Sequence, residues 1–134
     1  MKTLPLLICI VVCTILCNSC VQKTHLKTIT FSVDMNQVDA VSKVGIRGDL
    51  KPLSWDETIF MTDDDQNGIY ELTLDFHSAG PGLEFKFVNG NHQFELQDKD
   101  NRAIPFTYQP ETINYTATFN NLDDAETVLQ RKAN

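Results

Sequence analysis

Residues 69–76 have the sequence Ile-Tyr-Glu-Leu-Thr-Leu-Asp-Phe, in which large apolar side chains alternate strictly with polar ones from Tyr70 onward. Side chains of a β-strand point alternately to the two faces of a sheet, so the pattern predicts a strand with one buried face. Turn-forming residues precede it at Asp63–Gly68, and Gly80-Pro-Gly82 predicts a loop after it. This stretch favours a β-protein with turns between its strands.

The same alternation recurs outward in both directions, at the spacing of about 8 to 12 residues that is typical of sandwiches. Further strands are predicted around residues 28–35, 44–48, 59–61, 83–87, 94–96, 103–106 and 113–119. Asn89-Gly90 predicts a hairpin turn, and the alternation of Phe94 with Leu96 places Phe94 in the core. Residues 125–131 are expected to form either a short helix or an unordered C-terminal end. We therefore expect an all-β fold, a two-sheet antiparallel sandwich of about seven to eight strands.

Residues 1–19 form a separate region. Lys2 is followed by the apolar run Leu4–Leu16 and then by Asn18-Ser19 and Cys20, a pattern typical of a secretory signal peptide. The apolar run of 13 residues is shorter than the roughly 20 residues that a membrane-spanning helix needs. All four cysteines fall within residues 1–20, so the remainder of the chain has no thiol for a disulfide or a metal site.

The Ser19-Cys20 pair resembles the processing site of bacterial lipoproteins, in which a small residue precedes a cysteine that is diacylated. The resemblance implies a lipoprotein signal peptide at 1–19 and lipidation at Cys20; an ordinary cleaved signal peptide is the alternative. Residues 20–27 would then be a lipidated tether, 28–120 the sandwich and 121–134 a charged C-terminal tail. Two or three acyl chains hold a protein durably on a membrane, so we expect a secreted lipoprotein of the bacterial cell envelope, at the outer membrane.

Charge and motifs exclude several classes of function. After residue 20 the chain carries 10 basic and 18 acidic side chains, a net charge of −8, which argues against nucleic acid as a partner. The sequence contains no motif of a catalytic nucleophile, no metal-binding helix motif and no glycine-rich phosphate-binding loop. We therefore expect no enzymatic activity and no cofactor.

The acidic segment 63–68 has two interpretations. Asp63, Asp65 and Asn67 offer oxygen atoms at alternate positions, as in a calcium-binding loop, but Leu74 stands where such a loop has its bidentate glutamate. The same residues with Gly68 form a β-turn in which side-chain oxygens accept hydrogen bonds from backbone amides. The turn without a metal is the favoured interpretation.

Polar and aromatic side chains gather around two loops. Trp55, the only tryptophan, lies in the loop-like stretch 49–56, where it is either a lid on the core or an exposed platform. Lys86, Asn89, Asn91 and His92 lie around the predicted hairpin. An aromatic ring stacks on the C–H face of a sugar while amides and charged groups bind its hydroxyls, so these five residues form a candidate carbohydrate-binding site.

Four stretches in this order, Val44–Gly48, the loop closed by Trp55, Gly68–Tyr70 and Leu83–Gly90, resemble the starch- and glycogen-binding modules of early-set immunoglobulin type. With an opening strand such as Thr30–Met35, the pattern resembles modules in secreted Bacteroidetes-type proteins. The resemblance implies an immunoglobulin-like sandwich that uses Trp55 for stacking and Lys86 for hydroxyl groups. A second stacking tryptophan is expected after the Asn-Gly turn, where this chain has Asn91-His92-Gln93-Phe94.

The sequence therefore supports two functions. The first is a lipid-anchored, non-catalytic module that binds a polysaccharide or oligosaccharide, with α-glucan as the expected polymer and a glycoside hydrolase as a candidate partner. The second is a structural or protein-interaction module that has kept the sandwich and lost sugar binding, which the absent second tryptophan and the acidic surface favour.

Overall fold

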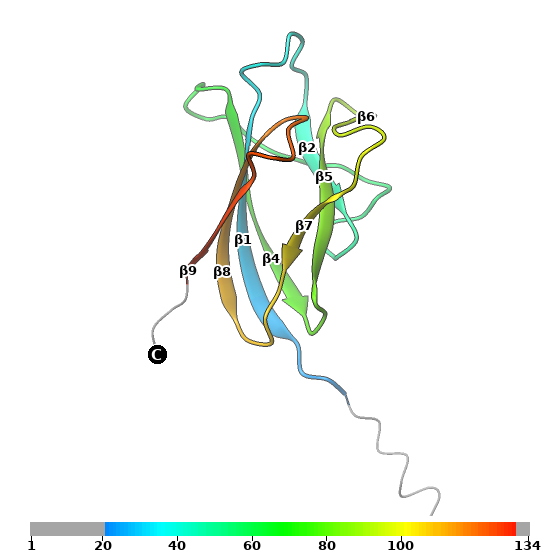
Figure 1. Cartoon of the computed structure of the whole chain (residues 1–134), viewed down its shortest axis with the longest axis vertical. Coiled ribbons are helices and arrows are strands. Elements are labelled where there is room, and N and C mark those ends of the chain that lie inside the picture. The colour runs from blue at the N-terminus through cyan, green and yellow to red at the C-terminus, as the bar shows by residue number, and fades with distance from the viewer. Residues whose placement is uncertain (1–20, 131–134) are drawn as a thin grey trace, which may run out of the picture.

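The computed structural model describes residues 21–130, which form two β-sheets packed against each other (Figure 1). The expected signal peptide, the lipidation site Cys20 and residues 131–134 lie outside this described part. Within residues 21–130 there is no helix, and so none with the length and hydrophobicity that crossing a membrane requires. The prediction of an all-β, two-sheet sandwich is confirmed.

The first sheet has four strands in the order β4-β1-β8-β9. Their bounds are β1 His25–Asp34, β4 Ile69–Ser78, β8 Glu111–Thr118 and β9 Glu126–Gln130. β1 pairs antiparallel with β4 and β8 pairs antiparallel with β9, but β1 and β8 run parallel. The parallel pair is the exception in a sandwich that the sequence predicted as antiparallel.

The second sheet has five strands, with β3-β2-β5-β6 in order and β7 also paired with β5. Their bounds are β2 Val44–Gly48, β3 Ile59–Phe60, β5 Gly82–Asn89, β6 Gln93–Phe94 and β7 Arg102–Pro105. All pairs in this sheet are antiparallel. β5 is the only strand of the described part that pairs with three others, so it organises the sheet.

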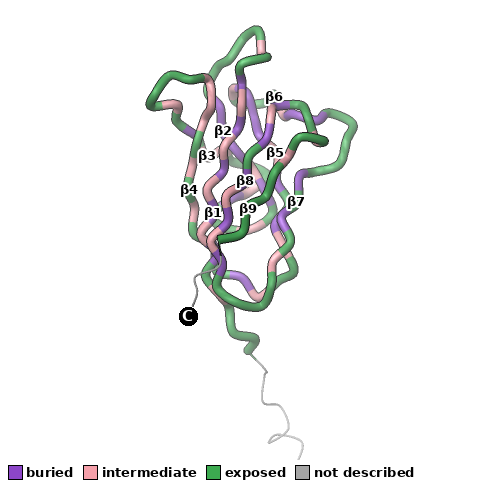
Figure 2. The backbone as a smooth tube through the Cα atoms, turned by 60° about the vertical axis from the view of Figure 1, so that its left-hand side comes forward, coloured by how far each residue is buried: buried purple, intermediate pink, exposed green. Residues whose placement is uncertain are grey.

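An aromatic cluster fills the space between the sheets. The ring of Phe85 lies edge-on to three others, with centroid distances of 5.1 Å to Phe31, 5.5 Å to Phe87 and 5.0 Å to Tyr115. Each such pair adds about 0.5–1.5 kcal/mol beyond the burial of its surface. The purple segments in Figure 2 alternate along the central strands, as expected when every second side chain enters the core.

A buried ion pair lies beside this aromatic cluster. Arg102 and Glu95 are both 0% exposed, with the Arg102 Nε donating to Glu95 Oε1 at 2.7 Å and Nη2 donating to Oε2 at 2.8 Å. Arg102 also donates to the hydroxyl of Tyr115 at 3.3 Å, and the backbone N–H of Phe87 donates to Glu95 at 2.8 Å. Since β7 carries Arg102 and β8 carries Tyr115, this network ties the two sheets together.

Three local predictions differ from the structure. Residues 25–27, expected in the tether, belong to β1, and Lys27 is buried with its Nζ 2.6 Å from Glu111 Oε2. Residues 126–130, expected as a helix or an unordered end, form β9. Phe94, expected in the core, lies on the outer face opposite Val88, because Glu95 takes the inward position to bind Arg102.

Candidate functional site

Arg47 joins three segments on the outer face of the five-stranded sheet. It lies on β2 opposite Lys86, and its guanidinium donates to Thr58 Oγ1 at 2.7 Å, to the carbonyl of Trp55 at 2.9 Å and to the carbonyl of Asn91 at 3.0 Å. The planar guanidinium group offers several donors in a fixed geometry, so one side chain can serve acceptors from different segments. Arg47 therefore holds the loop between β2 and β3 next to the β5–β6 hairpin.

The loop between β2 and β3 presents Trp55 at the surface. Leu53 anchors the loop in the core with 1% of its surface exposed, and its backbone N–H donates to the carbonyl of Leu50 at 2.9 Å. Two residues later, Trp55 keeps 36% of its surface exposed. A side chain of this size with a third of its area open to solvent can stack on a ligand without leaving its place in the loop.

Two phenylalanines extend the aromatic surface around Arg47. Phe60 on β3 is 43% exposed and lies opposite Gly45 on β2. A side chain at Gly45 would meet Thr58 Cγ2 at 2.3 Å, so glycine allows Thr58 and Phe60 to lie close over the sheet. On the other side, the half-buried ring of Phe94 lies 5.2 Å from the guanidinium carbon of Arg47, within cation–π range.

We call this area the Trp55 face and define it by Arg47, Trp55, Phe60, Asn91, His92 and Phe94. Sequence analysis found Trp55, Asn91 and His92, and all three are exposed. Phe60 was not among the candidates, although the strand predicted at residues 59–61 already places Phe60 on the face opposite Ile59 and Met61. Sequence analysis also missed the role of Arg47, whose acceptors are mostly backbone carbonyls that no sequence pattern encodes.

The polar groups of Lys86 and Asn89 form hydrogen bonds with the protein backbone and are not free polar groups of the Trp55 face. The Lys86 Nζ donates to the carbonyl of Leu96 at 2.8 Å and to that of Lys99 at 3.0 Å, which holds the loop after β6. Asn89 is 5% exposed, and its amide accepts from the Ser42 N–H and donates to the Ala40 carbonyl. Both were expected to bind a ligand, and both use their polar atoms within the protein.

The acidic segment 63–68 is a turn. The two carboxylate oxygens of Asp63 accept from the backbone N–H groups of Asn67 and Gly68, each at 3.0 Å. The Asn67 amide donates to Asp65 at 2.9 Å and accepts from the N–H of Ile69 at 2.7 Å. Gly68 has a φ of 83°, which glycine adopts without strain. Among residues 21–130 no group of three potential metal-binding side chains comes together.

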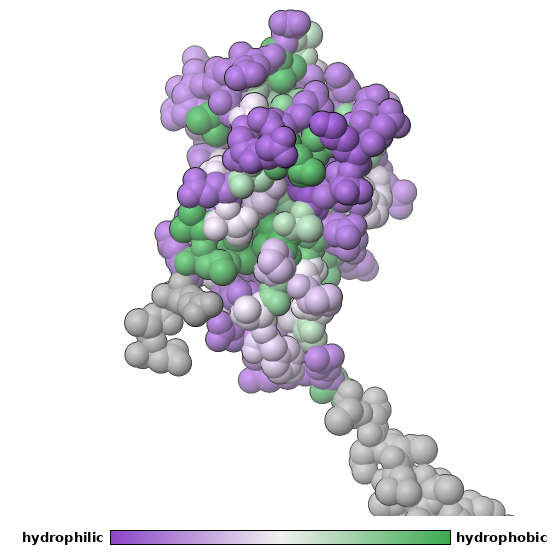
Figure 3. Space-filling model, viewed as in Figure 1, coloured by the Kyte–Doolittle hydropathy of each residue, from purple (hydrophilic) through white to green (hydrophobic). Residues whose placement is uncertain are grey.

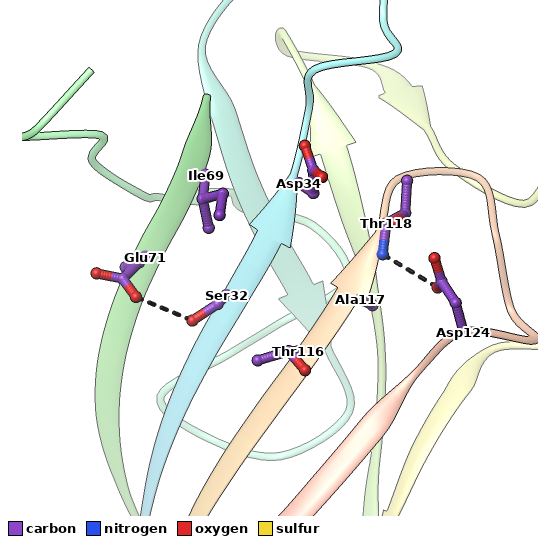
Figure 4. A pocket seen from close by; sticks show the side chains of 8 residues that line it. All are labelled: Ser32, Asp34, Ile69, Glu71, Thr116, Ala117, Thr118 and Asp124. Carbon is purple, nitrogen blue, oxygen red and sulfur yellow. Dashed lines mark hydrogen bonds between the residues drawn. The ribbon is translucent and has the colours of Figure 1, made fainter. Parts of the chain in front are cut away.

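A shallow groove of about 310 Å³ lies on the outer face of the other sheet, over β4, β1 and β8 (Figure 4). Its polar lining consists of Ser32, Asp34, Glu71, Thr116, Thr118 and Asp124. Ser32 donates to Glu71 at 3.1 Å, and the N–H of Thr118 donates to Asp124 at 3.2 Å, which holds the pKa of Asp124 below its ordinary value. The lining contains no aromatic ring, so the groove offers no stacking platform.

Comparisons with known proteins give similarity to solved structures only. No protein-family model and no curated protein sequence matches the chain. Similar solved structures include CBM25-2 and CBM25-1 of the beta/alpha-amylase from Paenibacillus polymyxa. CBM25-2 has a TM-score of 0.46 and 18% identity over 82% of this chain and 96% of that chain. CBM25-1 has a TM-score of 0.47 and 17% identity over 81% of this chain and 95% of that chain. The similarity is one of fold and extends over nearly the whole of both modules.

Proposed function

We propose that the chain is a lipid-anchored, non-catalytic glycan-binding module that holds an α-glucan against the Trp55 face. The observation that carries the proposal is the arrangement around Arg47, which fixes a partly exposed tryptophan beside a hairpin with exposed Asn91 and His92. The apolar C–H face of a glucose unit stacks on an aromatic ring, and its hydroxyl groups pair with amide and imidazole nitrogens.

The exposure of the face supports a polymer as ligand. Trp55 and Phe60 lie at the surface of the sheet, 36% and 43% exposed, where a long chain can lie across them without entering a cavity. Glycoside hydrolysis requires an acid that burial keeps protonated, and none of the six residues that define this face carries a carboxyl group. Binding without catalysis suits a module that keeps polymer near a glycoside hydrolase.

Affinity electrophoresis tests the proposal. Wild-type protein should be retarded in native gels that contain glycogen or amylopectin, and Trp55→Ala should migrate as it does in a gel without glucan. Tyr108→Ala is the matched control, because Tyr108 is an aromatic residue with 56% of its surface exposed on the β7–β8 loop, outside the Trp55 face. Equal migration of the wild type with and without glucan, or equal retardation of Trp55→Ala, would exclude glucan binding at this face.

The second candidate is a protein-interaction module. His92 stands next to the hairpin turn, where the resemblance to starch-binding modules leads one to expect a second stacking tryptophan. A pulldown from the cell envelope separates the two functions: a stoichiometric protein partner that added maltooligosaccharide leaves in place would favour the interaction module.

The lipid anchor is proposed at Cys20, close to the first strand. Only Val21–Thr24, four exposed residues outside any strand, separate it from β1 at His25, and four residues span at most about 14 Å. β1 begins at the end of the sandwich opposite the β5–β6 hairpin (Figure 1), so an anchor there would direct the hairpin away from the lipid. Cys20→Ser should move the protein from the membrane fraction to the soluble fraction. Unchanged fractionation would contradict lipidation at this residue.

A further inference from the structure

Two hollows adjoin at the end of the sandwich that carries the β5–β6 hairpin. The first has a volume of about 410 Å³ and the second about 380 Å³, and Gln93 and Asn120 line both. Figure 3 shows mainly hydrophilic surface at the end of the molecule where Figure 1 places β6 and the turn after β8. We call the two hollows together the amide trough and define it by Gln37, Gln93, Gln97, Asn120 and Asn121.

Neutral groups that both donate and accept hydrogen bonds line this trough. All the amide side chains that define it belong to exposed residues. An amide offers an NH2 donor and a carbonyl acceptor, and a hydroxyl group likewise donates and accepts. Among the lining residues only Lys99 and Asp124 are charged, and they belong to different hollows. The trough therefore suits a neutral ligand that is rich in hydroxyl groups.

The buried ion pair of Arg102 and Glu95 holds one wall of the trough, the turn after β8. The Glu95 Oε2 accepts from the N–H of Asn120 at 3.2 Å. The Arg102 Nη2 donates to the carbonyl of Thr118 at 2.9 Å and to that of Asn121 at 2.8 Å. Because these bonds are made from inside the core, the turn keeps its place without using the exposed amides.

The loop after β6 forms the other wall in an uncommon backbone conformation. Leu96 has a φ of 48° and Asn120 a φ of 64°, and the N–H of Leu96 donates to Asn120 Oδ1 at 2.8 Å. A positive φ is an outlier for a residue as bulky as leucine. Such strain persists only where surrounding contacts impose it, and it gathers at ligand sites. The Oδ1 of Asn120 is used by Leu96, so its NH2 group is the donor that a ligand would meet.

Phe94 connects the amide trough to the Trp55 face. Its ring lies 5.2 Å from the guanidinium carbon of Arg47, and the same residue lines the first hollow. Arg47 in turn donates to the carbonyl of Trp55. A polymer that stacks on Trp55 can therefore continue past Phe94 into the trough, which commits the trough to the ligand of the face.

We propose that the amide trough is a second contact region for the same α-glucan and binds glucose units beyond those that stack on Trp55, an inference that rests on the glycan binding proposed above. The Trp55 face supplies stacking, and the trough supplies hydrogen bonds to hydroxyl groups. A chain that reaches both makes the second contact within one complex, so it loses no further translational freedom. Longer oligosaccharides should bind more tightly than short ones for this reason.

Isothermal titration of the full chain with maltotriose and maltoheptaose tests the proposal. The double variant Gln93→Ala/Gln97→Ala removes two amides that, among residues 21–130, bond no other residue. Its affinity for maltoheptaose should fall about tenfold, and its affinity for maltotriose should stay the same. The matched control is Gln109→Ala/Gln130→Ala, which removes two exposed glutamines that do not line the trough.

The possible outcomes separate the trough from the Trp55 face. If the wild type binds neither oligosaccharide, both proposals are wrong. If the wild type binds and the double variant matches it for maltoheptaose, only the trough is overturned. An equal fall for both oligosaccharides, or an equal fall in the control variant, would overturn it too.

Nuclear magnetic resonance gives a second measurement that needs no variant. The side-chain NH2 signals of Asn120 should shift on addition of maltoheptaose and stay in place with maltotriose, because only the longer chain reaches the trough. Signals that do not move at saturating maltoheptaose would overturn the assignment of Asn120 to the glucan contact and the trough with it.

Discussion

Arg102 and Glu95 form a bidentate ion pair inside the sandwich, with Nε 2.7 Å from Oε1 and Nη2 2.8 Å from Oε2, and both side chains are fully buried. Burial disfavours the charged guanidinium, but the hydrogen bonds and charge of Glu95 outweigh it and raise the pKa of Arg102. The guanidinium also donates to the hydroxyl of Tyr115, so a single cation organises acceptors from both sheets.

Removing the negative charge of Glu95 should strongly destabilise the fold. Glu95→Gln leaves a buried cation without its counterion, and we expect the free energy of unfolding to fall by about 3–5 kcal/mol in urea denaturation. Glu84→Gln is the matched control, because Glu84 is exposed on β5 and its carboxylate accepts only from Asn101 at 3.1 Å. An equal, small loss in both variants would show that the buried pair contributes little.

Glu111 should make stability sensitive to acid. Burial acts to raise its pKa, but hydrogen bonds from Lys27 and Thr107 prevail and hold the pKa of Glu111 below its ordinary value of 4.5. A carboxyl whose pKa is lower in the folded state stabilises the fold above its unfolded pKa, and this contribution is lost as the pH falls through the folded value. Unfolding free energy should therefore drop below about pH 4.5 in the wild type.

Glu111→Gln removes this titrating group, so its stability should fall less steeply over the same range. The measurement is urea denaturation at a series of pH values, compared by slope since the variant is less stable throughout. An acid slope as steep as that of the wild type would assign the sensitivity to other carboxyl groups.

Gly68 should not tolerate a side chain. Its φ of 83° is strained for other residues, and an added Cβ would lie 2.3 Å from Asn36 Oδ1. We expect Gly68→Ala to cost about 1 kcal/mol or more in unfolding free energy, measured by thermal denaturation. Gly80→Ala is the control, since the nearest atom to its Cβ would be Ser78 Oγ at 3.4 Å. Similar melting temperatures for the two variants would contradict the strain at Gly68.

Arg47→Lys separates charge from geometry at the Trp55 face. Lysine keeps the positive charge but cannot reach Thr58, Trp55 and Asn91 together. Loss of one charge-assisted hydrogen bond costs about 1.5–3 kcal/mol, so the loop should loosen and glucan affinity should fall by about tenfold or more. Isothermal titration with a maltooligosaccharide measures affinity, and melting temperature shows whether the fold is kept. An unchanged affinity would show that Arg47 does not contribute to glucan binding.

Alternation predicted the long strands because each has a full face to bury. Tyr70, Leu72 and Leu74 pack against the core, and Ile29 and Phe31 lie within it. The same rule was wrong at Phe94, where β6 is two residues long and the inward place goes to Glu95. A buried acid is stable there only because Arg102 follows seven positions later, a pairing that a pattern of apolar residues does not contain.

β9 was missed for a related reason. Residues 126–130 have no face that enters the core, so no alternation marks them, and their strand conformation comes from pairing with β8. At the candidate site, Trp55 could be found as a lone tryptophan in a loop. The positions of Lys86 and Asn89 were also predictable, but their hydrogen-bond partners are backbone groups of distant loops.

The parallel pairing of β1 with β8 also constrains how the chain folds. Lys27 at the start of β1 bonds Glu111, 84 positions later, and β1 lies between β4 and β8 in the sheet. Contacts between such distant positions form slowly, because a long loop must close before they contribute. We therefore expect the pairing of β1 with β8 to form late in folding, and the sandwich to fold as one cooperative unit. A chain that stops before Glu111 would leave β1 with an open edge and a buried lysine without its acid, not a smaller folded domain.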